Sequence, residues 1–191
     1  DALRYFLMRN MVVGHDASFT LDAFVKRYNS DLANDYGNLV NRILILIYKN
    51  FDSLIPNPGK YNEIDLEVIN KCKNTPETVM NSYNNLKIHD ALEHIMELFR
   101  LLNKYLELKA PWKLVKGSDD DVKNAATTLY IAADILRIGT MLISPIMPNK
   151  TKLIFQYLNI DKTINFNFGE LISGKKISKP ENLFPRIDEV N

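Results

Sequence analysis

The chain has 191 residues, of which 46% are hydrophobic and 25% charged, and its 24 basic and 23 acidic residues give a net charge of +1. This length predicts one domain, or one domain with a small appendage, and the balanced charge excludes a basic nucleic-acid-binding tail and an intrinsically disordered chain. A single cysteine, Cys72, excludes a disulfide framework and a thiolate metal site. Any contact with nucleic acid must therefore come from a local site.

Helical spacing of apolar residues predicts most of the chain to be helical. Thr20 is typical of an N-cap and precedes an apolar stripe of about eight turns, and Ser118 with Asp121 resembles a capping box. Pro76 removes a backbone donor, which predicts a kink or a break near Asn74. The predicted helices are residues 1–13, about 20–50, 63–81, about 89–110, about 118–144 and 150–158.

The last thirty residues change character. Residues 163–169 alternate apolar and polar positions like a small strand, and a Gly-, Lys- and Pro-rich end follows. Amphipathic helices joined by short loops are typical of a bundle. We therefore predict an all-α fold of five or six helices with a short irregular, β-like C-terminal tail.

Several residues suggest catalytic chemistry, but none of them exceeds background. Residues 169–176 nearly fit the phosphate-binding loop G-x-x-x-x-G-K-[ST], but Lys176 replaces the hydroxyl that ligates magnesium, so a surface turn is the better interpretation. Cys72 with His89 or His94 suggests nucleophilic catalysis, yet a lone cysteine among apolar helix positions is usually part of the core. The histidines lack the spacing of a zinc site. We predict no catalytic and no metal-binding residue in this chain.

The polar residues of the long predicted helix are unusual for a solvated surface, where Lys and Glu are the ordinary choice. Asparagine is a mediocre helix former. Asn38 and Arg42 are four residues apart and project from one face, where an amide beside a planar guanidinium suits the reading of a base edge and its phosphate. A polar face or a buried hydrogen-bond network is the more usual explanation of such residues. They are Asp31, Asn34, Asp35, Asn38, Asn41 and Arg42.

Ala110-Pro111-Trp112 closes the fourth predicted helix. The indole either packs into the core, which is its usual role, or is presented as a platform on which a nucleobase stacks, an interaction of about 1–3 kcal/mol. In the second interpretation Pro111 stiffens the loop and nearby lysines attract phosphates, a combination found in proteins that read single-stranded RNA loops. The lysines are Lys104, Lys109, Lys113 and Lys116.

Five parts of the chain carry a family pattern. They are Asp1-Ala2-Leu3-Arg4-Tyr5-Phe6-Leu7 with Gly14-x-Asp16; Arg27-x-Asn29-x-Asp31-Leu32-Ala33-Asn34 with Gly37-Asn38-Leu39-x-x-Arg42; Asn103-x-Tyr105 with Ala110-Pro111-Trp112-x-Leu114-x-Lys116; Ile143-x-Pro145-x-Met147-Pro148; and Leu183-Phe184-Pro185-Arg186-Ile187. Together they resemble the methionyl-tRNA synthetase family over essentially the whole chain. The synthetases for Ile, Val, Leu and Cys share a similar bundle, but the Pro-Trp loop beside Gly-Asn-Leu-x-x-Arg favours methionine.

The resemblance implies an anticodon-binding helix bundle. Residues 1–16 would be the end of the linker region that follows a catalytic domain, residues 17–160 the bundle, and residues 161–191 a tail that packs back on it. It also implies the site residues. Trp112 would stack on the first anticodon base, a cytosine, Asn38 would bond its edge, Arg42 would hold the anticodon backbone or a neighbouring base, and Pro111 would shape the pocket. Asp31 and Asn34 would support them.

The family's ATP-handling signatures, HIGH and KMSKS, and its zinc-binding insertion are absent from the sequence. The resemblance therefore implies an inactive fragment without a cofactor of its own, whose class I parent would use ATP and Mg²⁺ as a methionine–tRNA ligase in the cytoplasm or an organelle. Its partners would be the tRNA(Met) anticodon loop and the missing catalytic domain, with no membrane and no DNA. The alternatives are a non-catalytic helical protein-interaction module and the equivalent domain of a related class I synthetase.

Overall fold

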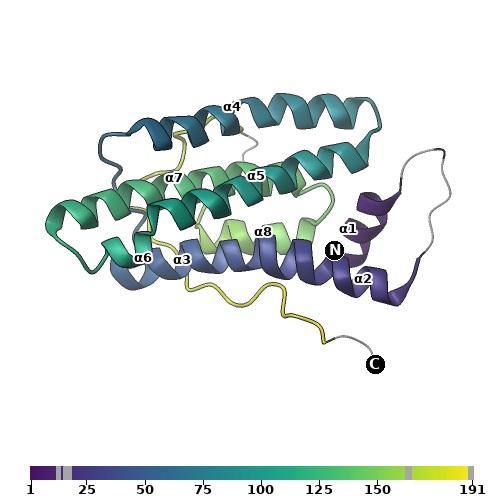
Figure 1. Ribbon diagram of the computed structural model, residues 1–191, viewed down its shortest axis with the longest axis horizontal. Helices are drawn as coiled ribbons and strands as arrows, with labels where there is room; N and C mark the ends of the chain where they lie inside the picture. Colours follow the sequence, from purple (N-terminus) through teal and green to yellow (C-terminus); the bar gives the residue numbers. More distant parts are fainter. Residues whose placement is uncertain (12–13, 15–18, 162–164, 189–191) are drawn as a thin grey trace.

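The computed structural model describes residues 1–11, 14, 19–161 and 165–188, and over these residues the fold is an all-α bundle (Figure 1). This confirms the predicted fold class. An isolated antiparallel bridge joins Leu54 to Lys176, and the described part of the chain contains no strand. The elements are α1 (Ala2–Asn10), α2 (Leu21–Arg27), the π-helix η1 (Tyr28–Asn38), α3 (Leu39–Asn50), α4 (Glu63–Asn84), α5 (Ile88–Lys109), α6 (Pro111–Leu114), α7 (Asp119–Ile143) and α8 (Pro148–Tyr157).

α2, η1 and α3 follow one another without a break and form the long helix that the apolar stripe predicts (Figure 1). Thr20 caps it, because its side-chain oxygen accepts a hydrogen bond from the Ala23 amide at 3.2 Å. The middle 11 residues are π-helical rather than α-helical. π-Helical turns are rare and occur frequently at functional sites, and this one carries most of the polar residues that the sequence singles out.

α7 lies at the centre of the bundle. It is long and apolar enough to cross a bilayer, but 94% of its most apolar window is buried inside the fold. Gly139 lets the ring of Phe99 on α5 pack directly on the α7 backbone, where a Cβ would overlap that ring. Phe99 stacks on Tyr36 of η1 with the ring centroids 4.3 Å apart, and the Tyr36 hydroxyl hydrogen-bonds Thr140 of α7 at 2.9 Å. These contacts fix η1 against the two central helices.

α4 runs through Pro76 as one continuous helix to Asn84, so of the predicted kink or break near Asn74 the break is wrong, and the kink stays a prediction. The proline removes one backbone hydrogen bond. However, it is buried on the same helix face as Cys72 and Val79, and α4 packs along α5. Burial of this face offsets the lost bond, which is why the helix does not break here.

Two of the long helices, α4 and α7, begin with a capping box. Ser118 and Asp121 form the predicted box at α7, and Asn62 and Asp65 form a second one at α4. Asp65 also pairs with Lys109 at the end of α5, with 2.9 Å between the Lys109 Nζ and the carboxylate. Asp65 thus ties the start of α4 to the end of α5, and Lys109 is not the free phosphate attractor that the sequence suggests.

The segment 165–188 is irregular. The carbonyl oxygens of Asn165 and Asn167 accept hydrogen bonds from the guanidinium of Arg137 on α7, at 2.6 and 2.7 Å. These carbonyls are therefore held by a buried side chain rather than by a partner strand. Residues 165–169 form no strand, and the other two positions of that prediction, 163 and 164, lie outside the described residues.

The first predicted helix and the predicted linker both extend into residues that the structure does not describe. The helix is observed as α1 and ends at Asn10, and residues 12–13 of its predicted range are not described. Asp16 of the first family pattern, and the expected boundary after it, also lie outside the described residues.

Candidate nucleic-acid interface

Trp112 is placed by a sharp reversal of the chain after α5. Ala110 ends that helix in the left-handed conformation, with φ 43° and ψ 54°, and its amide donates to the Leu106 carbonyl at 2.9 Å. Pro111, which is buried, then begins the short helix α6, where its fixed φ suits the first helical position. Trp112 is half-buried and packs against the hydrophobic core.

Arg42 comes to the same ring from α3. Its guanidinium carbon lies 5.0 Å from the centroid of the Trp112 ring, a cation–π geometry. One guanidinium nitrogen also lies 2.7 Å from a carboxylate oxygen of Glu107 on α5. The Arg42 side chain is 23% exposed and that of Glu107 is 63% exposed, so the ion pair lies at the protein surface.

The surface beside Trp112 is hollowed. This tryptophan hollow has a volume of about 430 Å³, and α6 contributes only its tryptophan to the lining. All the other lining residues lie on the long helix. The lining residues are Asn38, Asn41, Arg42, Ile45, Leu46 and Trp112. Three of the four predicted contact residues therefore meet in one hollow, and the fourth, Pro111, is buried and directly precedes Trp112 in α6.

Asp31 and Asn34, the predicted supporting residues, lie outside the tryptophan hollow. Asp31 is buried and accepts a hydrogen bond from the Tyr5 hydroxyl at 2.7 Å, which joins α1 to η1. Burial, and then the Asp31 charge, raise the pKa of Tyr5 well above its ordinary value, so this hydroxyl remains a donor. Asn34 is exposed and donates to the neighbouring Asp35 side chain at 3.1 Å.

The phosphate-loop interpretation of residues 169–176 does not survive in the structure. The Gly174 amide donates to the Ile55 carbonyl at 2.7 Å, and the Ile55 amide donates to the Lys175 carbonyl at 2.9 Å. The turn therefore uses its own backbone to hold the segment after α3. Cys72 is buried, and burial raises the pKa of its thiol to about 12, so the group stays protonated and unreactive at neutral pH.

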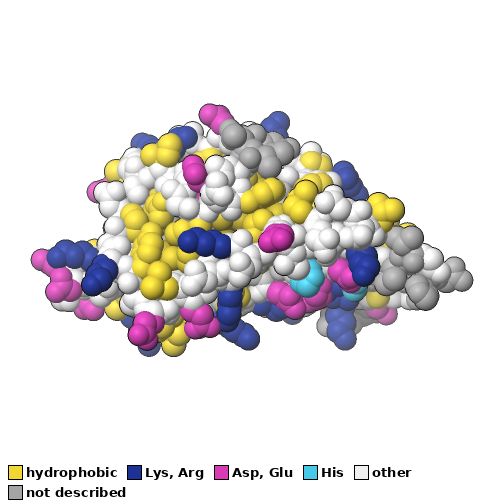
Figure 2. Space-filling model, turned by 90° about the horizontal axis from the view of Figure 1, so that it is seen from above, with side chains coloured by type: hydrophobic (Ala, Val, Ile, Leu, Met, Phe, Trp, Pro, Cys, Tyr) yellow, Lys and Arg dark blue, Asp and Glu magenta, His cyan; other side chains and the backbone are white. Residues whose placement is uncertain are grey.

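Charge on the surface is mixed. On the face seen in Figure 2, basic and acidic side chains are interspersed around a central apolar strip. Such a face offers no broad positive field to a polyanion. Since the whole chain carries a net charge of only +1, RNA binding by this fold would have to rest on a compact site such as the tryptophan hollow.

Sequence reasoning missed two participants of the site. Glu107 is one of them, because nothing local in the sequence indicates that it pairs with Arg42, which lies 65 positions away in the chain. Asn41 was noted as one polar residue among several, but it lines the hollow with Asn38. Its spacing of three residues from Asn38 was the available signal, because residues three apart are neighbours on a helix surface.

Comparison with known proteins decides the family. Residues 55–191 match a family model described as "Anticodon binding domain of methionyl tRNA ligase", and residues 1–44 match one described as "tRNA synthetases class I (M)". The chain belongs to the methionyl-tRNA ligase family. The first match covers most of the chain, and it removes the related synthetases for other amino acids as an alternative.

Individual members of the methionyl-tRNA ligase family agree over the whole chain. A methionine–tRNA ligase of Caldanaerobacter subterraneus is 41% identical over 98% of this chain, and one of Pyrococcus abyssi is 32% identical over 99%. The apo crystal structure of the Mycobacterium tuberculosis methionyl-tRNA synthetase superposes with a TM-score of 0.93 at 34% identity, covering 98% of this chain and 38% of that one. The chain spans 30% of the length of the Caldanaerobacter relative.

Proposed function

We propose that this chain is the part of a methionine–tRNA ligase that reads the CAU anticodon of tRNA(Met). Trp112 stacks on the cytosine at the first anticodon position, Asn38 hydrogen-bonds the edge of that base, and Arg42 holds the anticodon backbone or a neighbouring base. The observation that carries the proposal is the meeting of a half-exposed indole, a guanidinium and a carboxamide in one hollow. Pro111 shapes this hollow from below, and Asp31 supports it by fixing η1.

The chemistry of the hollow suits a base. Proteins that read single-stranded loops stack bases on aromatic rings and hydrogen-bond their edges. Specificity for cytosine would follow because a wrong base leaves polar groups of the site unpaired, which costs more than a made bond gains. In the protein-interaction alternative, this polar face would meet another protein or domain, Trp112 would be buried, and binding would not depend on the anticodon sequence.

The relatives support a proposal for the activity of the whole protein. Those named methionine–tRNA ligase are about three times as long as this chain, and one solved relative is described as bound by methionyl-adenylate. We propose that the parent protein attaches methionine to tRNA(Met) with ATP and Mg²⁺ in the cytoplasm, and that its catalytic domain precedes the residues present here. The 191-residue chain would then bind RNA without activating methionine.

Substitutions of Trp112 test the stacking. Trp112→Phe keeps an aromatic ring, whereas Trp112→Leu fills similar apolar space without a π-face. We expect the Leu variant to bind a CAU anticodon hairpin about 5- to 150-fold more weakly, the range given by 1–3 kcal/mol of base stacking, and the Phe variant to retain most of the affinity. Isothermal titration measures both, and thermal unfolding checks that the two variants are equally folded. Equal affinity of Phe and Leu variants would contradict a stacking role.

A further inference from the structure

The side chains of the tryptophan hollow come from two separate parts of the bundle. Trp112 follows α5 directly, through the left-handed residue Ala110. Asn38 is the last residue of η1, and Arg42 lies four residues later in α3. Because the indole and the two polar side chains belong to different helices, their meeting depends on how the long helix is aligned along α5.

One face of α5 contacts the long helix at three positions that are four residues apart. Phe99 stacks on η1, and Glu107 pairs with Arg42. Between them, the side-chain amide of Asn103 donates a hydrogen bond to the Asp35 carbonyl of η1 at 2.9 Å. Residues four apart lie on the same helix face, so the three contacts follow one line along α5 toward the turn that carries the indole.

The contact of Asn103 differs from the other two because its partner is the helix backbone. In a regular α-helix the Leu39 amide would bond to the Asp35 carbonyl, but here it bonds to the Tyr36 carbonyl. The Asp35 carbonyl has thus lost its α-helical partner, and it accepts from Asn103. This hydrogen bond therefore stabilises the irregular backbone at the end of η1.

α5 itself does not explain an asparagine at this position. Asparagine is a mediocre helix former, and Asn103 lies inside a helix of 22 residues. Its amide also donates to the Phe99 carbonyl of its own helix at 3.2 Å, a type of bond that competes with helical structure. What the half-buried side chain contributes is its contact with η1.

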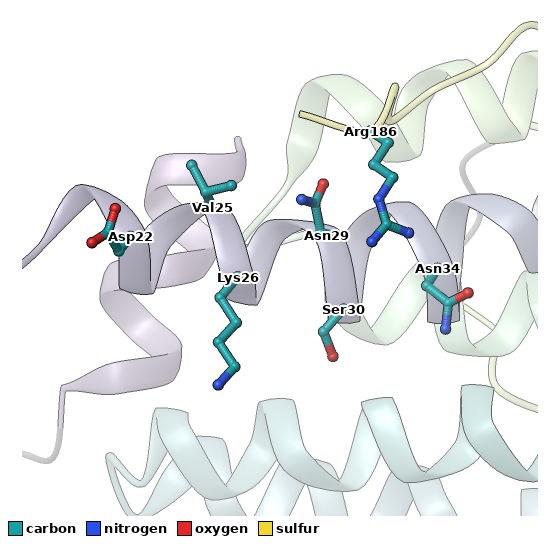
Figure 3. Close-up of a pocket in the computed structure, with 7 residues that line it drawn as sticks. All are labelled: Asp22, Val25, Lys26, Asn29, Ser30, Asn34 and Arg186. Carbon is teal, nitrogen blue, oxygen red and sulfur yellow. The ribbon is translucent and has the colours of Figure 1, made fainter. Parts of the chain in front are cut away.

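The tail holds the other end of η1. Asn29 exchanges two hydrogen bonds with the backbone of Ile187, at 2.7 and 2.9 Å. In Figure 3 the Arg186 side chain comes from the C-terminal segment and reaches toward the helix between Asn29 and Asn34. The tail thus fixes the first turn of η1, whereas Asn103 fixes a carbonyl three residues before Asn38.

We propose that Asn103 is a positioning residue of the candidate site, whose amide holds the end of η1 in the register that places Asn38 and Arg42 beside Trp112. It acts through the Asp35 carbonyl and not by contact with RNA. A register change of one residue would turn the helix on one side of η1 by about 100° relative to the other side. The effect on RNA binding rests on the proposed function, but the effect on the contact between Arg42 and Trp112 does not.

Quenching of Trp112 fluorescence by acrylamide tests the register without RNA. Asn103→Leu removes the donor and raises the helix propensity of α5, so a merely structural role predicts no increase in quenching of the folded protein. We expect this variant to be quenched about as much more than the wild type as Arg42→Gln is, because the guanidinium leaves the indole in both. Asn103→Ala, which adds no apolar bulk, should behave like Asn103→Leu.

A matched control removes a comparable hydrogen bond elsewhere. The Tyr83 hydroxyl of α4 donates to the Leu142 carbonyl of α7 at 3.1 Å. Tyr83→Phe deletes this bond between a side chain and a backbone carbonyl, away from η1. It should leave both the acrylamide quenching and the RNA affinity at the wild-type values.

Titration with CAU and UAU anticodon hairpins tests the consequence for RNA. Apparent affinity falls with the fraction of the protein in the competent register. Both Asn103 variants should therefore bind the CAU hairpin about 3- to 10-fold more weakly, the scale of one hydrogen bond, with little change for UAU.

The outcomes separate the two proposals. Unchanged quenching in both Asn103 variants overturns the positioning role even if CAU binding weakens, since Asn103 would then act by touching the RNA. Increased quenching with unchanged CAU affinity overturns it as well. Absence of a CAU over UAU preference in the wild type would instead overturn the proposed function, and the quenching would still decide whether Asn103 sets the register.

Discussion

Arg42 is the residue on which the candidate site depends most, because it makes two contacts with different consequences. It lies over the indole of Trp112 at 5.0 Å and pairs with the carboxylate of Glu107 at 2.7 Å. The guanidinium thus covers one face of the indole, and the carboxylate of Glu107 balances the guanidinium charge. A phosphate that approaches this hollow must compete with Glu107 for the only arginine in the hollow lining.

This arrangement predicts opposite effects for the two partners. Arg42→Gln should weaken binding of a CAU hairpin about tenfold and make the dependence of log K on log salt shallower by about one, because one counterion-releasing contact is lost. Glu107→Gln should tighten binding of CAU and UAU hairpins alike and steepen that slope, since the freed guanidinium accepts any phosphate. Filter binding across a series of salt concentrations measures both.

A surface acid on the same helix provides the control. Glu97, which lies 3.2 Å from His94, is comparably exposed and distant in sequence from the tryptophan turn. Glu97→Gln should leave the affinity and the salt slope unchanged. If Glu107→Gln behaved like Glu97→Gln, the ion pair with Arg42 would have no part in RNA binding.

At the scale of elements, the sequence predicted most helices because their signals are local. Caps and apolar spacing place α4, α5, α7 and the long helix within a few residues. The π-helical turns of η1 were not predictable, because their apolar spacing does not differ enough from that of an α-helix over such a short range. The hydrogen bond from Arg137 to the Asn165 carbonyl could not be predicted from local sequence signals either, because it joins residues 28 positions apart.

The features of the candidate site likewise divide into those that local sequence signals predict and those that they do not. The spacing of Asn38 and Arg42 on one helix face follows from sequence alone. That this face meets Trp112, 70 residues further on, was implied by the family resemblance and not by any local pattern. A second hollow that Asn38 and Asn41 line together with Asn182 of the tail was beyond both, because Asn182 had no signal that distinguished it from a solvated loop residue.

The contact between η1 and the tail predicts a stability effect. Gly37→Ala would place a Cβ 2.8 Å from the Leu32 carbonyl oxygen and 3.2 Å from the Phe184 ring. Either the helix or the tail must move, so we expect a loss of about 1–3 kcal/mol in the free energy of unfolding, the usual cost of overpacking. Urea denaturation followed by circular dichroism measures it. An unchanged midpoint would mean that the tail is not seated on η1 as described.

For the whole molecule, the balance of charge is informative. With a net charge of +1, long-range attraction to RNA is weak, and selectivity has to come from short-range contacts. The bundle supplies a rigid base for such contacts, because η1 is packed on the central helices and the tail is fastened along it. The hollow beside Trp112 lies on this base.

The central claim is that Trp112 and its neighbours read the first anticodon base. Trp112 is the only tryptophan of the chain, so its fluorescence reports on the site without labelling. The measurement is a titration of the chain with two anticodon hairpins that are identical except that one carries CAU and the other UAU. The account predicts saturable quenching with CAU and little response to UAU at the same concentration. Equal weak responses that disappear with added salt would contradict it and would indicate phosphate contact without base recognition.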